Sequence, residues 1–175
     1  MHLDFIADAT NIILVGPNGV GKSLIAQNLA HQAVIQGHSA LFINAAQMLG
    51  DLAAQDGDNA LRRRFAHYAR PDVLVIDEIG YLSYGNRHAD LLFEIVNRRY
   101  EHKPTIITTN RPFAEWSEVF PNAACVVSIV DRLVHHAEIL VIEGESYRMR
   151  EAKQRAAKKK NIKSKQRRNP PEPTE

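Results

Sequence analysis

The sequence lacks the features that mark disulfide-bonded, membrane-spanning and secreted proteins. It has one cysteine, Cys125, which excludes an intrachain disulfide and agrees with a reducing cytoplasm. No apolar run approaches the roughly 20 residues of a membrane-spanning helix. The first ten residues contain no lysine or arginine of the kind that begins a secretory signal. We therefore expect a cytoplasmic protein with no membrane partner.

The 175 residues are ordinary in overall composition, with 45% hydrophobic and 24% charged side chains, and suffice for one compact domain. The charges, however, are unevenly distributed. Residues 1–147 hold 11 Lys and Arg against 17 Asp and Glu, a net charge of −6, whereas residues 148–175 hold 11 against 3, a net charge of +8. We expect a core over residues 1–150 and a basic, disordered tail over residues 151–175.

The stretch over residues 148–168 has no proline, glycine or aromatic residue and too little apolar surface to fold alone. Cations without interleaved aromatics favour contact with the phosphate backbone of a nucleic acid over base stacking. A tail that is merely solvated is the alternative. The basic triplet Arg62, Arg63 and Arg64, on a predicted helix, has similar alternatives: a solvated face, or contact with nucleic acid or another subunit.

A glycine-framed loop follows an apolar run near the start of the chain. Residues 12–15 are typical of a buried parallel strand, and residues 16–23, GPNGVGKS, fit the phosphate-loop pattern G-x-x-x-x-G-K-[ST] at every fixed position. In such a loop, backbone N–H groups and the positive end of the next helix face the phosphates. An ordinary strand, turn and helix is the alternative.

The loop predicts a site for ATP and Mg²⁺. Lys22 would contact the β and γ phosphates, and the hydroxyl of Ser23 would bind Mg²⁺. The residues predicted to bind nucleotide are Gly16, Pro17, Asn18, Gly19, Val20, Gly21, Lys22, Ser23 and Leu24. The helix that follows is predicted to bury the stripe formed by Leu24, Ile25, Leu29, Ala30, Ala33 and Val34.

A second apolar run, residues 73–76, ends in two adjacent carboxylates, Asp77 and Glu78. An acid at the carboxyl end of a parallel strand beside a phosphate loop holds Mg²⁺ directly or through its water, and we assign this role to Asp77. Glu78 is placed to orient and activate the attacking water. The predicted metal ligands are thus Ser23 and Asp77, and Lys22, Asp77 and Glu78 are predicted catalytic residues.

Asn110 directly follows a predicted strand over residues 105–109. Its amide is placed to hold the attacking water or the γ-phosphate and so to report hydrolysis. A plain turn residue before Arg111 and Pro112 is the alternative. With both phosphate-site motifs present, we favour the catalytic interpretation.

A helix predicted over residues 124–136 carries one more candidate, Arg132. Its predicted buried face consists of Val126, Val127, Val130, Leu133 and Val134, and the opposite face of Ser128, Asp131, Arg132 and His135. Arg132 would therefore project away from the core of its own subunit. There it is either solvated or, in an oligomer, an arginine finger for a neighbour's γ-phosphate. Adjacent His135 and His136 would diverge on a helix, which disfavours a metal pair.

The remaining pattern completes an alternation of strands and helices. We expect a strand over residues 40–44, two helices within residues 46–70 that break near residues 56–58, and a closing strand over residues 137–143 with a short partner over residues 146–149. A helix before Pro104 is predicted to expose Arg98 and Arg99 and to bury Leu91, Leu92, Phe93, Ile95 and Val96.

Four runs together, GPNGVGKS, VLVIDEIGYL, TIITTNRPFAEWSEVF and IVDRLVHHAEIL, resemble the IstB-like, DnaC-related branch of the AAA+ ATPases, the helpers of insertion-sequence transposases. The likeness covers roughly residues 3–150. It implies an α/β P-loop NTPase of the AAA+ three-layer type, whose five-stranded parallel sheet has the phosphate-loop strand in the middle. It also implies that Asp77 is the Walker B acid, Glu78 the catalytic acid, Asn110 sensor 1 and Arg132 the finger in trans.

Members of that family usually have a helical N-terminal region before the core. Because the predicted phosphate-loop strand starts at about residue 12, we expect that region to be missing here, and we expect no C-terminal lid with a second sensor arginine. The resemblance implies an ATP-hydrolysing, DNA-associated helper of a transposase, acting as a nucleotide-dependent oligomer on double-stranded DNA. The alternatives are a DnaC-type loader of a replicative helicase and a truncated nucleotide-binding module without hydrolysis. A GTPase is disfavoured because an Asn-Lys-x-Asp base-reading motif is absent.

Overall fold

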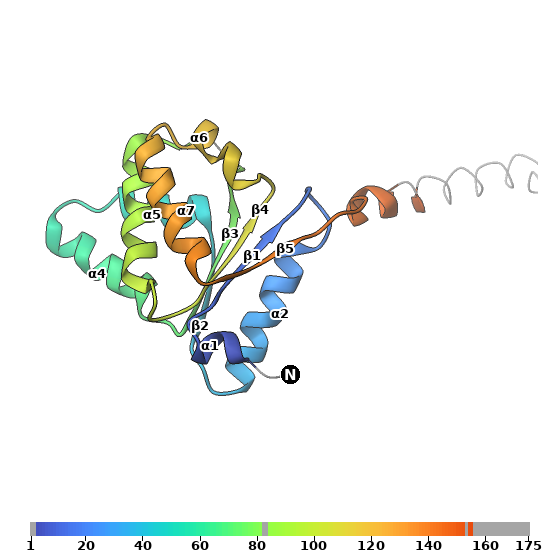
Figure 1. The fold of residues 1–175 in the computed structure, drawn as a ribbon, viewed down its shortest axis with the longest axis horizontal. Coiled ribbons are helices and arrows are strands. Elements are labelled where there is room, and N and C mark those ends of the chain that lie inside the picture. Colours follow the sequence, from blue (N-terminus) through green and yellow to red (C-terminus); the bar gives the residue numbers. More distant parts are fainter. Residues whose placement is uncertain (1–2, 82–83, 153, 156–175) are drawn as a thin grey trace, which may run out of the picture.

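A computed structural model describes residues 3–81, 84–152, 154 and 155. Five parallel strands form one sheet with helices on both faces (Figure 1). The strands are β1 (Asn11–Val15), β2 (Ala40–Asn44), β3 (Val73–Ile79), β4 (Thr105–Thr109) and β5 (Ala137–Val141). The predicted α/β class and five-stranded parallel sheet are confirmed. The order is β2-β3-β4-β1-β5, so β4 is central and the prediction that the phosphate-loop strand lies in the middle is wrong by one place.

The helices form two layers around the sheet. They are α1 (Asp4–Ala7), α2 (Lys22–Ile35), α3 (Ala45–Ala53), α4 (Asp58–Ala69), α5 (Asn86–Arg99), α6 (Trp116–Val119) and α7 (Ala123–His135), with a 3₁₀ turn, η1 (Phe113–Glu115). On one face of the sheet, α1 and α2 cover a small core. On the other, α3, α5 and α7 cover a larger core, to which α6 adds the fully buried Trp116. The break between α3 and α4 lies where it was predicted.

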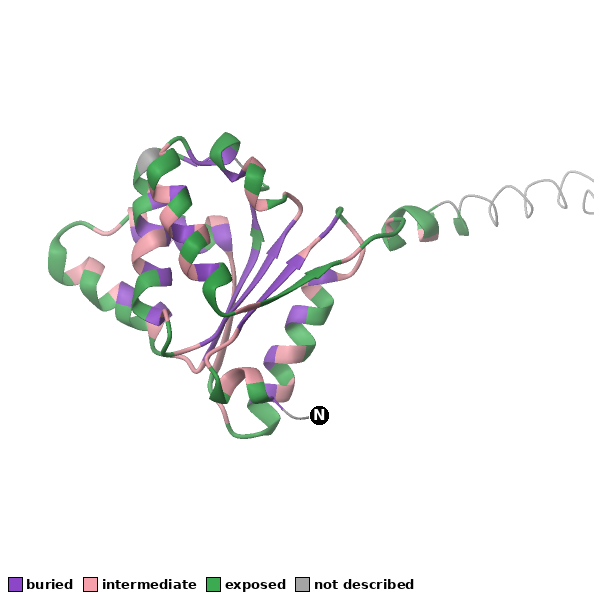
Figure 2. Cartoon of the chain, in the orientation of Figure 1, coloured by how far each residue is buried: buried purple, intermediate pink, exposed green. Residues whose placement is uncertain are grey.

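Helix α2 packs through a face that overlaps the predicted stripe only in part. Its buried side chains are Lys22, Ala26, Ala30 and Ala33, whereas Leu24 and Val34 are 64% and 54% exposed. The three alanines follow the i, i+4, i+7 spacing of one helix face, and their small size lets the backbone lie close to the sheet. Leu29 of the predicted stripe packs partly against the small core, whereas Leu24, Ile25 and Val34 are exposed. Figure 2 shows buried and exposed positions alternating along α2.

The faces of α5 and α7 were predicted with mixed success. Leu91, Leu92, Ile95 and Val96 of α5 are buried as predicted, but Arg99, predicted to be exposed, is only 1% exposed. On α7 the buried side chains are Val126, Ile129 and Leu133, whereas Val127 is 68% exposed. The apolar stripe of α7 is thus rotated from the predicted one, because the surface of α5 decides which valines are covered.

The segment after β5 does not form the short partner strand predicted for residues 146–149. Residues 147–152 are helical, and the backbone N–H of Tyr147 donates to the carbonyl of Gly19 at 3.0 Å. The chain therefore returns to the phosphate loop. Most of the predicted disordered tail, residues 153 and 156–175, lies outside the described residues, so that prediction is untested. Among the described residues no helix has the length and apolar character needed to cross a membrane.

Candidate nucleotide-binding site

A cavity of about 670 Å³ opens at the carboxyl ends of β1, β3 and β4, the edge of a parallel sheet at which ligands usually bind. The phosphate loop forms one wall. The lining residues are Asn18, Gly19, Val20, Gly21, Lys22, Ser23, Leu24, Glu78, Tyr81, Thr109, Asn110, Tyr147 and Arg148. Seven of the nine predicted nucleotide-binding residues, together with Glu78 and Asn110, therefore line the cavity.

The glycines of the loop are required by close contacts. A Cβ at Gly16 would collide with the carbonyl oxygen of Ile142, and one at Gly19, whose φ is 83°, would collide with the hydroxyl of Ser146. The N-cap of α2 is Gly21, which has no side chain to bond the first N–H groups of the helix. Those N–H groups are the ones that bind phosphate at a helix N-terminus.

Lys22 is held beneath the loop and is only 8% exposed. Its Nζ donates to the carbonyl oxygens of Gly16 at 2.6 Å and Pro17 at 2.8 Å. Burial lowers the pKa of Lys22, and the nearby carboxylates of Asp77 and Glu78 oppose that shift. The phosphate loop therefore holds the ammonium group of Lys22 in position through two of its own carbonyl oxygens.

Asp77 is surrounded by hydroxyl groups. The hydroxyl of Ser23 donates to Asp77 Oδ1 at 2.9 Å, and the hydroxyl of Thr108 donates to the same oxygen at 2.5 Å. Hydroxyl and carboxylate oxygens are the ligands that Mg²⁺ prefers, so the pair Ser23 and Asp77 has the chemistry predicted for the metal site.

Thr108 also fixes the backbone of the second carboxylate. Its hydroxyl accepts from the backbone N–H of Glu78 at 2.9 Å, at a point where the pairing of β3 with β4 shifts register between Ile76 and Ile79. Glu78 lies in this irregularity with a φ of 63°. The side chain of Glu78 is consequently exposed to the cavity while its neighbour Asp77 is buried.

A residue at the end of β2 holds the carboxylate of Glu78. Asn44 pairs with Asp77 in the β2–β3 register, and its Nδ2 donates to Glu78 Oε2 at 2.9 Å. The sequence interpretation missed both Asn44 and Thr108. A signal existed for each, because Asn44 ends an apolar strand just as Asn110 does, and Thr108 is a polar residue in a strand that is buried throughout.

Arg132 does not line the cavity of its own chain. Its guanidinium lies over the ring of Phe93 at 4.7 Å, and its Nε donates to Asn97 Oδ1 at 3.2 Å. The half-buried side chain therefore lies across α5 and is not fully solvated. Its role in trans stays a prediction.

The fold and the loop geometry agree with the comparison to known proteins. A family model described as IstB-like ATP-binding protein matches residues 1–156. The chain belongs to the IstB-like ATP-binding protein family. The family resemblance drawn from the four sequence runs is thereby confirmed.

Two relatives of this IstB-like chain are proteins of insertion sequences. One from Geobacillus stearothermophilus, named as an ATP-binding protein of IS5376, is 37% identical over 92% of this chain and 64% of its own length. One from Pseudomonas aeruginosa, named as an ATP-binding protein of IS21, is 40% identical over 91% of this chain and 60% of its own length. The chain thus spans less than two thirds of either relative.

Among solved structures, the DnaC helicase loader aligns with a TM-score of 0.63 and 22% identity, over 80% of this chain and 85% of that one. At this identity the likeness concerns the fold alone. It shows that the IstB-like chain shares the α/β fold of that protein.

The IstB-like site also contains side chains that the sequence interpretation did not predict. Tyr81 follows β3, and Tyr147 and Arg148 come from the segment that returns after β5. The hydrogen bond between Tyr147 and Gly19, with the close contacts of Ile142 and Ser146 to Gly16 and Gly19, brings that segment to the loop. No sequence motif predicts these contacts, because they depend on the path of the chain after the last strand.

Proposed function

We propose that this IstB-like chain binds ATP together with Mg²⁺ at the phosphate-loop cavity and hydrolyses ATP to ADP and phosphate. The observation that carries the proposal is the convergence of Lys22, Ser23, Asp77 and Glu78 on one edge of the sheet. Mg²⁺, when bound, supplies neutralising charge at the β and γ phosphates. A donor set of one hydroxyl and one carboxylate fits that ion.

Each residue of the site has a separate task in this proposal. Lys22 contributes its positive charge at the phosphates, and the N–H groups at the start of α2 contribute dipoles. Ser23 and Asp77 hold the metal ion. Glu78 orients the attacking water and accepts its proton, and Asn110, beside it at the end of β4, holds the water or the γ-phosphate.

For the protein's wider role we propose an ATP-dependent helper of a transposase that assembles as an oligomer on double-stranded DNA. Three observations support it: two relatives named for insertion sequences, a net charge of +8 over residues 148–175, and an Arg132 that lies outside its own cavity. In such an oligomer Arg132 of one subunit would complete the site of the next.

The first experiment measures phosphate release and particle size with and without duplex DNA. Lys22→Ala should abolish nucleotide binding, whereas Glu78→Gln should retain ATP binding and stop turnover. Absence of turnover in the unaltered protein, with nucleotide binding intact, would favour the truncated binding module.

Arg132→Ala should also stop turnover while nucleotide binding is spared. If the arginine acts in trans, mixing Arg132→Ala with Glu78→Gln should restore activity, because about one quarter of the interfaces in a random equal mixture combine an intact Glu78 with an intact Arg132. Unchanged turnover in Arg132→Ala, or no recovery in the mixture, would contradict the role in trans.

The DNA proposal is tested by removing residues 151–175. The shortened protein should bind duplex DNA more weakly and with a flatter dependence on salt, because fewer phosphates are neutralised. The matched control changes Arg62 and Arg63, both exposed on α4, to glutamine. If the control loses affinity and the shortened protein does not, the DNA surface lies on α4.

The partner is tested by capture of purified transposase against purified replicative helicase, each offered to the protein with ATP. Retention of the transposase supports the helper function. Retention of the helicase instead would identify the protein as a loader of the DnaC type.

A further inference from the structure

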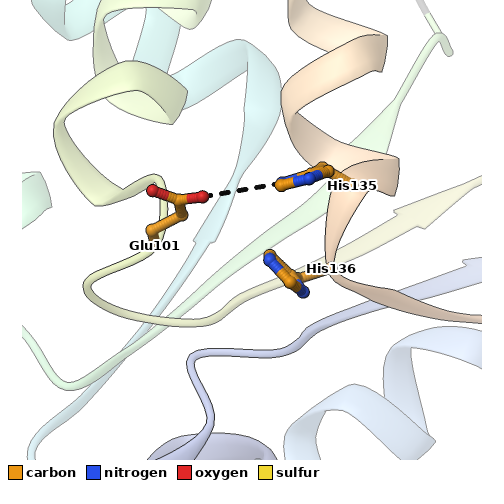
Figure 3. Close-up of side chains that lie close together, drawn as sticks. All are labelled: Glu101, His135 and His136. Atoms are coloured by element: carbon orange, nitrogen blue, oxygen red, sulfur yellow. Dashed lines mark ion pairs between the residues drawn. The ribbon is translucent and has the colours of Figure 1, made fainter.

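Three side chains meet at the edge of the sheet opposite the nucleotide cavity. Glu101 precedes β4, and His135 and His136 precede β5, so all three lie at the amino ends of strands (Figure 3). One potential ligand atom from each residue lies within 4.8 Å of the others. All three side chains are exposed, and the proposed ATPase site uses none of them.

The two histidines converge because α7 ends between them. His135 is the last residue of the helix, and His136 has left the helical conformation with φ −128° and ψ 84°. Their ring centroids are consequently only 4.3 Å apart, with an angle of 62° between the ring planes. The expectation that adjacent histidines would diverge assumed that the helix continued through His136, and that assumption was wrong.

The backbone on both sides of the cluster is fixed by hydrogen bonds. The carbonyl of His136 accepts from the N–H of Asn11 at 2.8 Å, which joins it to the start of β1. Glu101 has a φ of 58° in a turn whose next two N–H groups both donate to the carbonyl of Arg99. Because β4 and β5 flank β1 on opposite sides, these two turns are held near each other by the sheet.

Tyr100 connects the carboxylate to the imidazole. Its hydroxyl lies 2.8 Å from His135 Nδ1, and Glu101 Oε1 lies 3.6 Å from the same nitrogen. Loss of hydration raises the pKa of Tyr100, and the charge of Glu101 raises it further. The oxygen of the neutral phenol can accept a hydrogen bond from His135 Nδ1–H, which leaves the lone pair of Nε2 for a metal ion, as groups that orient metal-binding imidazoles do.

We propose that Glu101, His135 and His136 bind one divalent transition-metal ion of the Zn²⁺ type, with water completing a tetrahedral shell. Two imidazoles and one carboxylate suit zinc, whereas Mg²⁺ prefers an all-oxygen site. Zinc–ligand bonds of about 2.0–2.2 Å place the ligand atoms about 3.4 Å apart. The side chains are exposed, so rotation about their own bonds closes the remaining gap.

A metal ion here would connect the turn before β4 to the end of α7, the helix that carries Arg132. The site lies at the opposite edge from the phosphate loop, and the proposal stands whether or not the protein hydrolyses ATP. The direct consequence is thermal stabilisation by the ion, because binding to the folded state alone raises the free energy of unfolding.

The experiment titrates Zn²⁺ into chelator-treated protein that carries no polyhistidine tag, with excess Mg²⁺ and without nucleotide. Co²⁺ replaces Zn²⁺ in a parallel titration, because its visible absorption reports tetrahedral coordination by nitrogen and oxygen. We expect one ion per chain, a rise in the melting temperature, and affinity at least about tenfold weaker in each of His135→Ala, His136→Ala and Glu101→Gln. Tyr100→Phe should weaken binding less, since it removes only an orienting group.

Two control variants test whether zinc binds to other side chains of the protein. His31→Ala changes an exposed histidine on α2, and Cys125→Ser removes the one thiol, so both should bind zinc as the unaltered protein does. Binding of less than one ion per chain, equal affinity in the double variant His135→Ala/His136→Ala, or one ion shared by a metal-induced dimer would each overturn the proposal.

Discussion

The side-chain amide of Asn44 donates to Glu78 Oε2 at 2.9 Å while its carbonyl oxygen accepts from the backbone N–H of Ala46 at 2.9 Å. One residue thus holds the proposed catalytic carboxylate and caps helix α3. The hydrogen bond directs the carboxylate of Glu78 toward the end of β2. Release of Glu78 from Asn44 is therefore a step that the proposed hydrolysis requires.

The two tasks of Asn44 predict different results for two substitutions. Asn44→Ser keeps a good N-cap but removes the amide donor, so basal ATP turnover should rise severalfold with the melting temperature unchanged. Asn44→Ala removes both and should also lower the free energy of unfolding by about 1 kcal/mol. Phosphate release and thermal unfolding of both variants check this. A fall in turnover with Asn44→Ser would mean that the hydrogen bond orients Glu78 for catalysis.

Arg148 lines the cavity, whereas Arg150, two residues later, lies over the ring of Tyr147 and is not among the lining residues. Arg148→Ala should weaken ATP binding by about five- to tenfold, because an exposed guanidinium near phosphates contributes roughly one charge-assisted hydrogen bond. Arg150→Ala should leave the affinity unchanged. Titration with a fluorescent ATP analogue at low and high salt measures both, and equal losses would indicate a general charge effect.

Much of the fold followed from the sequence because its strands are short apolar runs with clear ends. Residues 40–44 and 105–109 were predicted with the bounds that β2 and β4 have. The faces of the helices were less predictable. Helix α7 has apolar side chains around most of its circumference, so periodicity alone does not say which ones α5 covers.

Some residues of the candidate site were predictable from the sequence and others were not. Lys22, Ser23, Asp77 and Glu78 were predictable because fixed spacing and strand ends place them at one edge of the sheet. The residues that orient them were not, because Asn44 and Thr108 come from other strands and act through contacts between side chains. Contacts of that kind depend on strand order, which the sequence does not state directly.

The hydrogen bonds of Asp72 predict that the free energy of unfolding falls in acid. Its Oδ2 accepts from the backbone N–H of Ser39 at 2.9 Å and from the Ser39 hydroxyl at 2.8 Å. These bonds lower the pKa of Asp72 from 3.8 to about 2. Because the folded protein holds the carboxylate ionised, its contribution is complete above about pH 4 and is lost as the pH falls toward 2. The side chain is 40% exposed, so the contribution is below about 1 kcal/mol.

Thermal unfolding of Asp72→Asn and the unaltered protein measures that contribution. The difference between their melting temperatures should be constant near neutral pH and should shrink between pH 4 and pH 2.5. Asp56→Asn, at an exposed position between α3 and α4, serves as the control and should show no such change. A difference that grows as the pH falls would contradict the assignment.

Substitution of Arg99 gives the largest predicted loss of stability. Its guanidinium is buried and donates five hydrogen bonds that join the end of α4 to the starts of β3 and β4. The acceptors are the carbonyl oxygens of Ala69, Pro71, Asp72 and Pro104 and the hydroxyl of Thr105. Burial lowers the pKa of Arg99 to about 10, so the side chain is still charged at neutral pH. Arg99→Met should lower the free energy of unfolding by more than about 3 kcal/mol, because several buried acceptors lose their donor.

Arg98 provides the matched control one residue away. It is exposed, pairs with Glu94 at 2.7 Å and lies over the ring of Phe65, so Arg98→Met should lower the free energy of unfolding by less than about 1 kcal/mol. The loss for Arg99→Lys should lie between those of Arg99→Met and Arg98→Met. An ammonium keeps the charge but cannot reach all the acceptors that the planar guanidinium reaches. Urea unfolding of the three variants gives the ranking. Equal effects at positions 98 and 99 would mean that the carbonyl oxygens around Arg99 find water when the guanidinium is removed.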